Sequence, residues 1–341
     1  MPKVVVSATV RLALVACTAS ASVAGCALLG SSGWRSPYGV AHPLVGYIYD
    51  VAGQAYVTQT ELAGRLAEAR FVLLGEQHDN VDHHRLQARV IRALVARERT
   101  PAVVMEMLDT DDTVAIQQCL ATRRCSARRL AEAVDWQGSG WPSWRIYEPV
   151  LRAALDAGLV VAPGSLPSAA VRDYARTGQL DAPLATPLPL DDPLDPALAA
   201  AMAEEIHDSH CGHAPESMID GMVAAQRLRD LHMAESVLLA APLGRAVLIA
   251  GFGHTRNDRP LAAALRAAEP DDPTVSLAFV EVDDAILPPW AYAERFATET
   301  LPFDYVWFTP RSDDSDPCER FREQLRDLGR VEQREGRPLG N

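Results

Sequence analysis

The sequence predicts an α/β protein with a mostly parallel central sheet flanked by helices. Six short, continuous apolar runs are typical of strands buried on both faces of a sheet. Helical patterns separate several of them, for example Leu86, Val90 and Leu94 at a spacing of four. Strand, helix, strand order implies parallel pairing with helices on both faces. The runs cover residues 71–74, 102–105, 159–161, 246–249, 276–280 and 305–308.

Residues 1–25 are predicted to be a secretion signal that is removed. Lys3 and Arg11 precede an uncharged apolar run that is too short to span a bilayer. The run ends in Val-Ala-Gly-Cys, which resembles the lipobox of bacterial lipoproteins, whose cysteine is acylated; an ordinary signal peptide is the alternative. Ala27 replaces the aspartate that retains lipoproteins in the inner membrane. We therefore expect palmitate on Cys26 to anchor the protein at the outer membrane, facing the periplasm or the cell surface.

A short hairpin and helix are predicted before the first buried strand. Residues 26–43 have the composition of a flexible tether. Residues 46–50 and 54–57 alternate in polarity like the strands of a hairpin. Thr58 and Glu61 have the spacing of a capping box, which opens a helix.

The α/β domain is predicted to span residues 44–310 and to carry a helical cap. Two intervals between strands are too long for single crossovers, so helical insertions are expected at about 108–150 and 165–240. Five prolines early in the second insertion predict an extended connection. Residues 311–341 are expected to form a C-terminal helix and a loose tail.

Charge and cysteine content narrow the possible partners. The formal charge of the 341 residues is -13, which argues against a nucleic-acid binder because phosphate recognition needs clustered cations. Removal of the leader and acylation of Cys26 leave four cysteines, which are expected to form disulfides outside the cytosol. Cys119 and Cys125 are expected to pair locally, which leaves Cys211 with Cys318; a zinc site is the alternative.

Polar residues follow three of the predicted strands at the end where α/β sheets bind ligands. Glu76 and His78 follow the first run, Glu106 ends the second, and His254 follows the fourth. We expect the four to converge on one crevice. There they could act as acid and base, or His78 and His254 could hold a divalent metal. The alternative is a buried polar cluster that only fixes the loops.

His83 and His84 open the next predicted helix. Adjacent helical residues point about 100° apart, so the two rings cannot both serve that crevice. We expect one to face the crevice and the other to face solvent.

These motifs together resemble the ChaN-like lipoproteins, the haem-binding uptake family of the Tiki superfamily. Gly-Glu-x-His follows the first strand, a glutamate ends the second, and Gly-x-Gly-His follows a late strand. Residues 136–147 and 222–234 match the family as well, and the likeness covers roughly residues 45–310. One departure is the sequence Asn-Asp-Arg-Pro at residues 257–260, where the family often continues toward an Asp-x-Gly-Val-Pro-like turn.

The resemblance implies a haem-binding lipoprotein in haem and iron uptake, with haem in a crevice between the sheet and the helical cap. The superfamily also contains metal-dependent peptidases and erythromycin-esterase-like hydrolases, so a metal-dependent hydrolase that uses the Glu/His cluster is the alternative. A third possibility is a membrane-surface interaction module in which the cluster has lost its function. A flat haem shared between two protomers would make the protein a homodimer.

Haem needs an axial ligand, apolar faces and cations for its propionates. The residues expected to meet these needs, or to line a polar pocket wall, are His207, His213, Gln226, Arg227, Asp230, Arg256 and Trp141. Histidine, methionine and tyrosine all remain possible as axial ligands. The alternatives are that the tryptophans pack in a core and that Arg227 and Asp230 form an ion pair on a solvated helix face.

Overall fold

The computed structural model describes residues 33–122, 124–180, 184–186, 188–241, 244–323 and 326. The predicted signal peptide, Cys26 and the end of the predicted tail lie outside these residues. Within the described ranges, no helix is both long enough and apolar enough to cross a membrane.

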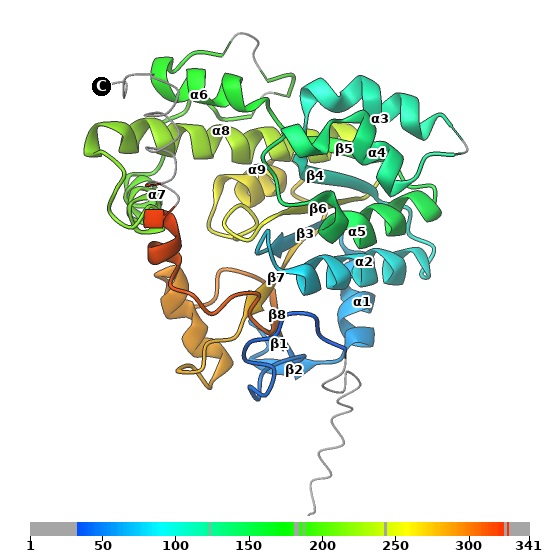
Figure 1. The fold of residues 1–341 in the computed structure, drawn as a ribbon, viewed down its shortest axis with the longest axis horizontal. Helices are drawn as coiled ribbons and strands as arrows, with labels where there is room; N and C mark the ends of the chain where they lie inside the picture. The colour runs from blue at the N-terminus through cyan, green and yellow to red at the C-terminus, as the bar shows by residue number, and fades with distance from the viewer. Residues whose placement is uncertain are drawn as a thin grey trace, which may run out of the picture.

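An eight-stranded mixed sheet forms the centre of the molecule, in the order β2-β1-β8-β7-β3-β6-β4-β5 (Figure 1). The strands are β1 (Ile48–Asp50), β2 (Ala55–Val57), β3 (Phe71–Glu76), β4 (Ala102–Asp109), β5 (Val161–Ser165), β6 (Ala246–Gly251), β7 (Thr274–Glu281) and β8 (Tyr305–Thr309). From β8 through β7, β3, β6 and β4 to β5, neighbouring strands of the sheet are parallel. The hairpin of β1 and β2 joins the sheet at β8 in the antiparallel direction. The predicted mostly parallel sheet is confirmed, and each of the six apolar runs lies within a strand or overlaps one.

Helices cover both faces of the sheet, as predicted. The α-helices are α1 (Gln59–Glu68), α2 (Val81–Val95), α3 (Thr113–Leu120), α4 (Ala127–Ala133), α5 (Trp144–Asp156), α6 (Ser168–Thr177), α7 (Pro196–Ser209), α8 (Glu216–Ala240) and α9 (Pro260–Ala268). The 3-10 helices are η1 (Thr110–Asp112), η2 (Trp136–Gly138) and η3 (Pro289–Phe296). The predicted capping box opens α1: Glu61 N donates to Thr58 Oγ1, and Thr58 N donates to the Glu61 carboxylate.

Alternation along β3 shows how the two helical layers are held. Val72 and Leu74 pack in a cluster with residues of α1, α2 and α5. Phe71 and Leu73 point to the other face and pack with residues of α8 and α9. Since successive side chains of a strand point to opposite faces, the part of a strand that packs against helices on both sides is apolar at successive positions, as residues 71–74 are. All six residues of β3 are buried, which is why its sequence lacks the polar alternation of a surface strand.

Both long intervals between strands contain helices. α3, α4 and α5 follow β4, and α6, α7 and α8 follow β5. α8 contacts β4, β5, β6 and α9, and α6 and α7 pack against α8 (Figure 1). Of the proline-rich connection, residues 184–186 and 188–195 form neither helix nor strand, as predicted. Leu188 and Leu190 of this connection pack at the edge of the core beneath α8.

Both predicted disulfides are present. Cys119–Cys125 closes the turn between α3 and α4. Cys211–Cys318 links the turn after α7 to the helical segment at residues 317–323. This second bond brings Phe321 to the histidines after α7, with its ring centroid 5.8 Å from that of His210.

Residues 33–43, part of the predicted tether, lie against the domain. The backbone amides of Arg35 and Ser36 each donate to Asp82 Oδ2 over 2.8 Å. Ser36 Oγ donates to Asn80 Oδ1 over 2.9 Å, and both Ser36 and His42 are buried. The ordered structure therefore begins before residue 44, because the start of α2 supplies acceptors that composition alone does not reveal.

Candidate functional site

The ends of β3, β4 and β6 bring Glu76, His78, Glu106 and His254 together, and these four residues are called the strand-end cluster. β6 lies between β3 and β4 in the sheet, so the three strand ends are neighbours. His78 Nδ1 lies 3.0 Å from Glu76 Oε1, and His78 Nε2 lies 4.0 Å from Glu106 Oε2. His254 Nε2 lies 3.4 Å from Glu106 Oε1. Carboxylates and imidazoles therefore alternate along one row.

Two glycines allow the loops of the cluster to approach one another. The amide of Gly251 donates to Glu106 Oε2 over 2.8 Å. A Cβ at this position would lie 3.0 Å from His78 Nε2, so a larger residue would displace the ring. A Cβ at Gly75 would collide with Thr255 Oγ1. Each glycine therefore makes room for the loop that carries the other motif: Gly75 for Thr255, and Gly251 for His78.

Glu76 is completely buried and is surrounded by donors. Tyr147 Oη donates to Oε1 over 2.9 Å, and Gln87 Nε2 donates to Oε2 over 2.6 Å. His84 Nδ1 lies 3.1 Å from Oε2. Burial alone would raise the pKa of Glu76, but the neighbouring His84 and the hydrogen bond from His78 hold that pKa well below its ordinary value. The carboxylate is therefore a fixed negative charge. His84 is the member of the His83 and His84 pair that faces the cluster, whereas the sequence analysis missed Gln87 as a partner.

The prediction that His83 or His84 faces solvent is wrong, because both are buried. His83 Nδ1 accepts from the amide of Gln77 over 2.9 Å, and Nε2 lies 2.8 Å from Thr309 Oγ1. Burial, with the charge of His84, lowers the pKa of His83 to about 3. The rings do point apart as expected, but the end of β8 covers the side that would otherwise be open.

Asp230 of α8 adds a third carboxylate to the row. Its Oδ1 lies 2.6 Å from His254 Nδ1. Burial alone would lower the pKa of His254, but Glu106 and the hydrogen bond to Asp230 raise that pKa to about 10. Burial would raise the pKa of Glu106, but His254 lowers it to about 2. A protonated His254 therefore lies between two buried carboxyl groups, and Asp230 bonds to it rather than to Arg227.

We expect the free energy of unfolding to be highest near pH 6.5, because the pKa of His83, lowered from 6.5 to about 3, makes stability fall as the pH drops below 6.5. The pKa of His254 is raised from 6.5 to about 10, so its stabilisation is complete below pH 6.5 and is lost as the pH rises toward 10. The pKa of Glu106 is lowered from 4.5 to about 2, so its stabilisation is complete above pH 4.5 and is lost toward pH 2. Urea unfolding across this range measures the profile, and a maximum on the alkaline side of neutrality would contradict it.

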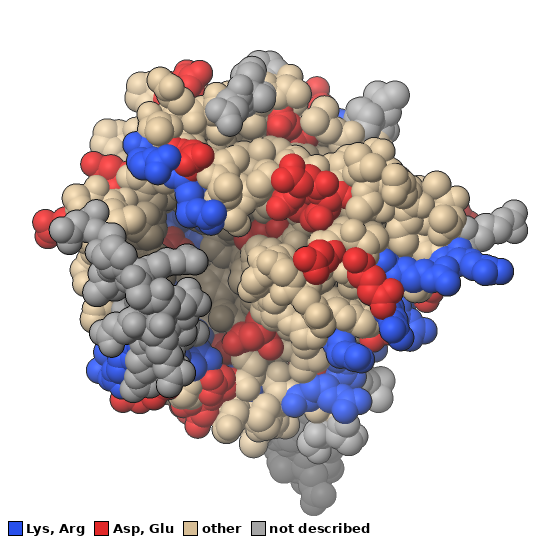
Figure 2. Space-filling view, turned by 45° about the horizontal axis from the view of Figure 1, so that its top comes forward, with Lys and Arg blue, Asp and Glu red and all other residues tan. Residues whose placement is uncertain are grey.

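His78 connects the strand-end cluster to solvent. Its side chain is 35% exposed, while those of Glu76, Glu106 and His254 are 9% exposed or less. The ring of Trp141 lies edge-on to His78, with 4.9 Å between centroids. Trp141 and Glu106 also line a polar cleft of about 430 Å³. Figure 2 shows Asp and Glu side chains gathered beside a hollow on the face of the molecule that it draws.

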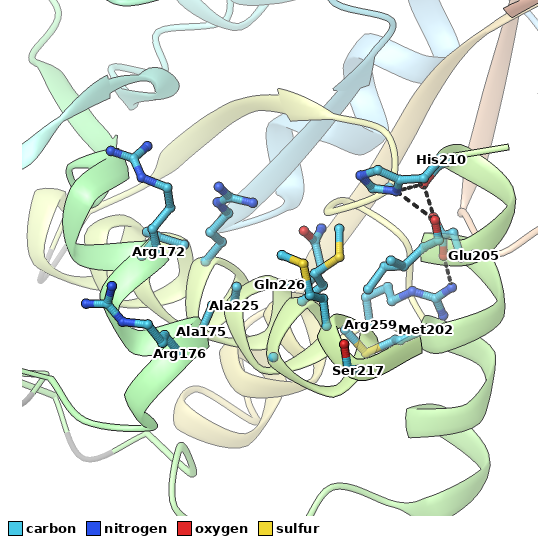
Figure 3. A pocket seen from close by; sticks show the side chains of 18 residues that line it. Arg172, Ala175, Arg176, Met202, Glu205, His210, Ser217, Ala225, Gln226 and Arg259 are labelled. Atoms are coloured by element: carbon cyan, nitrogen blue, oxygen red, sulfur yellow. Dashed lines mark hydrogen bonds and ion pairs between the residues drawn. The ribbon is translucent and has the colours of Figure 1, made fainter. Parts of the chain in front are cut away.

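A larger cavity of about 800 Å³ lies between α6, α7 and α8. Figure 3 shows Arg172 and Arg176 of α6 on one side and, on the other, Glu205 of α7 and His210, which directly follows α7. Gln226 of α8 lines this cavity, and its Nε2 lies 3.1 Å from His254 Nδ1. The cavity therefore adjoins the strand-end cluster through one side chain. We refer to it below as the helical cavity.

Several residues predicted to bind the cofactor lie outside the lining of the helical cavity. His207 and His213 are exposed on the surface near the end of α7. Arg227 donates to the backbone oxygens of Pro189 and Asp192, so it holds the proline-rich connection.

Arg256 is also engaged elsewhere. It is only 4% exposed and forms ion pairs with Asp258 over 2.7 Å and with Glu205 over 3.5 Å. Of the predicted ligand-binding residues, Gln226 alone contributes to the lining.

The cavity walls contain residues that sequence reasoning did not select. They include His210, which directly follows α7, Arg229 of α8 and the pair Arg172 and Arg176 of α6. The spacing of four between the two arginines was a visible signal, since it places both on one face of a helix. What the sequence could not show is which neighbouring helix that face meets.

The metal alternative requires several donor side chains around one point. Across the residues that the structure describes, no group of three or more His, Cys, Asp and Glu side chains has an arrangement that could hold a metal ion. His78 and His254 are instead engaged with carboxylates of the protein, as given above.

The fold and the site define an α/β protein with a ligand-sized cavity beside its strand ends. The model of the family described as "Haem-binding uptake, Tiki superfamily, ChaN" matches residues 62–265, which is more than half of the 341 residues. The chain therefore belongs to the haem-binding uptake family of the Tiki superfamily, as its motifs suggested. No protein with curated annotation matches the sequence.

A solved structure shows the same fold. The chain is similar to ChaN of Campylobacter jejuni, whose structure is described as cofacial heme binding, with a TM-score of 0.60 and 19% sequence identity. That match covers 76% of this chain and 95% of ChaN. An erythromycin esterase, EreC, matches with a TM-score of 0.38 and 16% identity, over 65% of this chain and 72% of its own. A likeness at that level carries no argument about function.

Proposed function

We propose that this chain is a haem-binding lipoprotein of haem and iron uptake that holds haem in the helical cavity. Membership of the haem-binding uptake family supports the ligand class. The observation that carries the choice of site is the cavity of about 800 Å³ between α6, α7 and α8, next to the strand ends. Its volume lies within the roughly 300–1,000 Å³ that is typical of small-molecule sites. In this proposal α6, α7 and the first half of α8 are the predicted cap.

The apolar part of the lining fits the faces of a porphyrin. Met202, Met218 and Met222 come from α7 and α8, and Ile206 and Val171 add branched side chains. Methionine side chains are flexible and polarisable, so they can adapt to a flat aromatic ligand. Met202, Ile206 and Val171 are buried, whereas Met218 is 55% exposed.

The charged part of the lining fits the propionates. Arg172, Arg176 and Arg229 line the cavity of a protein whose formal charge is -13. Arg176 pairs with Asp173 over 2.7 Å, while Arg172 and Arg229 have no ion-pair partner among the residues that the structure describes. Guanidinium groups bind carboxylates through two parallel hydrogen bonds, which suits the two propionates of haem.

His210 is the residue best placed to be an axial ligand. Its Nδ1 donates to the backbone oxygen of Ile206 over 2.7 Å, which leaves Nε2 as the nitrogen with a free lone pair. A second nitrogen fixed in this way is typical of histidines that ligate metals. Bound haem would supply an iron centre with an open coordination position, and this chain would supply the histidine and exclude water.

Absorption spectroscopy tests the proposal. Titration of purified residues 27–341 with haem is expected to give a saturable shift of the Soret band, because an imidazole nitrogen changes the ligand field of the iron. Spectra that remain the sum of free haem and free protein at every ratio would contradict the proposal.

We also propose that a lipid on Cys26 anchors the protein to the outer membrane. The apolar leader that ends in Val-Ala-Gly-Cys supports this. In cells fed labelled palmitate, the label is expected in the wild-type protein and is expected to be lost in Cys26→Ser. Label that persists in the variant would contradict anchoring at this residue.

A homodimer with haem between the protomers remains part of the proposal, and light scattering with and without haem tests it.

A further inference from the structure

One helix presents a row of arginines beside the point where the described chain begins. Arg85, Arg89 and Arg92 are exposed on α2 and line a cleft of about 490 Å³, together with Gly33 and Trp34. Their spacing of four and three places them on one face, over about 10 Å of helix axis. These three residues are called the arginine row.

Arg85 helps to hold the fold, whereas the other two members of the arginine row do not. Arg85 donates to the backbone oxygen of Gly33 and to Asp82 Oδ1, each over 2.7 Å. Asp82 is buried and is already held by the backbone amides of residues 35 and 36. The guanidinium groups of Arg89 and Arg92 have no hydrogen-bond or ion-pair partner within the part of the chain that the structure describes. Exposed cations without partners are unexpected in a protein of charge -13, where acidic neighbours are abundant.

We propose that the arginine row is a contact surface for the anionic phospholipid headgroups of the membrane that holds the lipid anchor. The proposal rests on the proposed anchor at Cys26, because only 33 − 26 = 7 residue steps separate that residue from Gly33. Seven steps reach at most about 25 Å, so the anchor keeps Gly33, whose backbone oxygen accepts from Arg85, within that distance of the bilayer.

The chemistry of the row suits that surface. Guanidinium forks match phosphate oxygens, and Trp34 adds an aromatic ring of the kind that lies at headgroup level. Electrostatic forces act over a Debye length of about 8 Å at physiological salt, so the local arginines outweigh the acidic remainder of the surface. Since one anchor point alone permits rotation, a second contact at α2 would fix which side of the domain faces away from the membrane.

Vesicle sedimentation with residues 27–341, which lack the acylated cysteine, tests the row apart from the anchor. The protein is expected to bind vesicles that contain phosphatidylglycerol and not to bind vesicles of phosphatidylcholine alone. At about 1 kcal/mol for each arginine near an anionic surface, Arg89→Gln/Arg92→Gln is expected to weaken partitioning about 30-fold. Raising the salt until the Debye length falls to about 3 Å is expected to abolish wild-type binding.

The control variant is Arg124→Gln/Arg128→Gln, which removes the same charge from α4 and the turn before it. It is expected to bind vesicles like the wild type. The inference would be overturned if both variants lost the same amount of vesicle partitioning, or if the wild type bound neutral and anionic vesicles equally well. Each variant is also titrated with haem, because a failure of the lipid contact with intact haem binding overturns only this inference, whereas loss of haem binding in the wild type overturns the proposed function.

Discussion

His254→Ala is expected to lower the free energy of unfolding by about 3 to 5 kcal/mol, the usual cost of removing one partner from a buried ion pair. His254 lies 3.4 Å from Glu106 and 2.6 Å from Asp230, and both carboxyl groups are buried. Without the imidazole they face each other with no cation between them. For a domain of this size the melting temperature is expected to fall by about 10 °C, as measured by differential scanning calorimetry.

His207→Ala is the matched control, because His207 is exposed at the end of α7. Its expected change is within about 0.5 kcal/mol, as for other surface substitutions. The double variant Glu106→Gln/His254→Ala is expected to lose less stability than the two single variants added together, because removal of one carboxylate relieves part of the repulsion. If His254→Ala is as stable as His207→Ala, the account of the strand-end cluster is wrong.

Ala225→Trp is expected to weaken haem binding by about tenfold to a hundredfold, or about 1.4 to 2.8 kcal/mol. Ala225 lies on α8 and lines the helical cavity beside Gln226, as Figure 3 shows. An indole at this position takes space that the porphyrin needs. The cavity itself can accept the new ring, so the loss of stability is expected to stay within the range of about 1–3 kcal/mol for overpacking. A Soret titration gives the dissociation constant.

Leu239→Trp tests the same change elsewhere on the same helix. Leu239 is 58% exposed near the end of α8 and does not line the cavity. Its haem affinity is expected to equal that of the wild type. If Ala225→Trp remains folded in calorimetry and binds haem as tightly as Leu239→Trp, haem lies elsewhere.

Much of the fold could be predicted because buried parallel strands leave a strong signal. β3 and β6 are buried at every position, so both read as uninterrupted apolar runs. β5 was placed two residues too early, since the apolar run begins at Leu159 while the strand contains Pro163 and Gly164. The packing of residues 33–43 on α2 could not be predicted, because it depends on hydrogen bonds between residues more than 40 positions apart.

The strand-end cluster could be predicted from topology, whereas the cavity walls could not. Residues at the ends of neighbouring parallel strands must lie close together, so Glu76, Glu106 and His254 follow from the strand order. The helical cavity depends on how α6 and α7 cross α8, which periodicity does not determine. His210 was therefore no better a candidate than His207 or His213, although the structure places only His210 in the lining.

A crystal structure of residues 27–341 with haem is the most direct test of the central claim. We predict porphyrin density between α6, α7 and α8, with the propionates near Arg172 and Arg176 and the iron within bonding distance of His210 Nε2. Density outside the helical cavity, such as on the polar cleft beside Trp141, would contradict this account of the site.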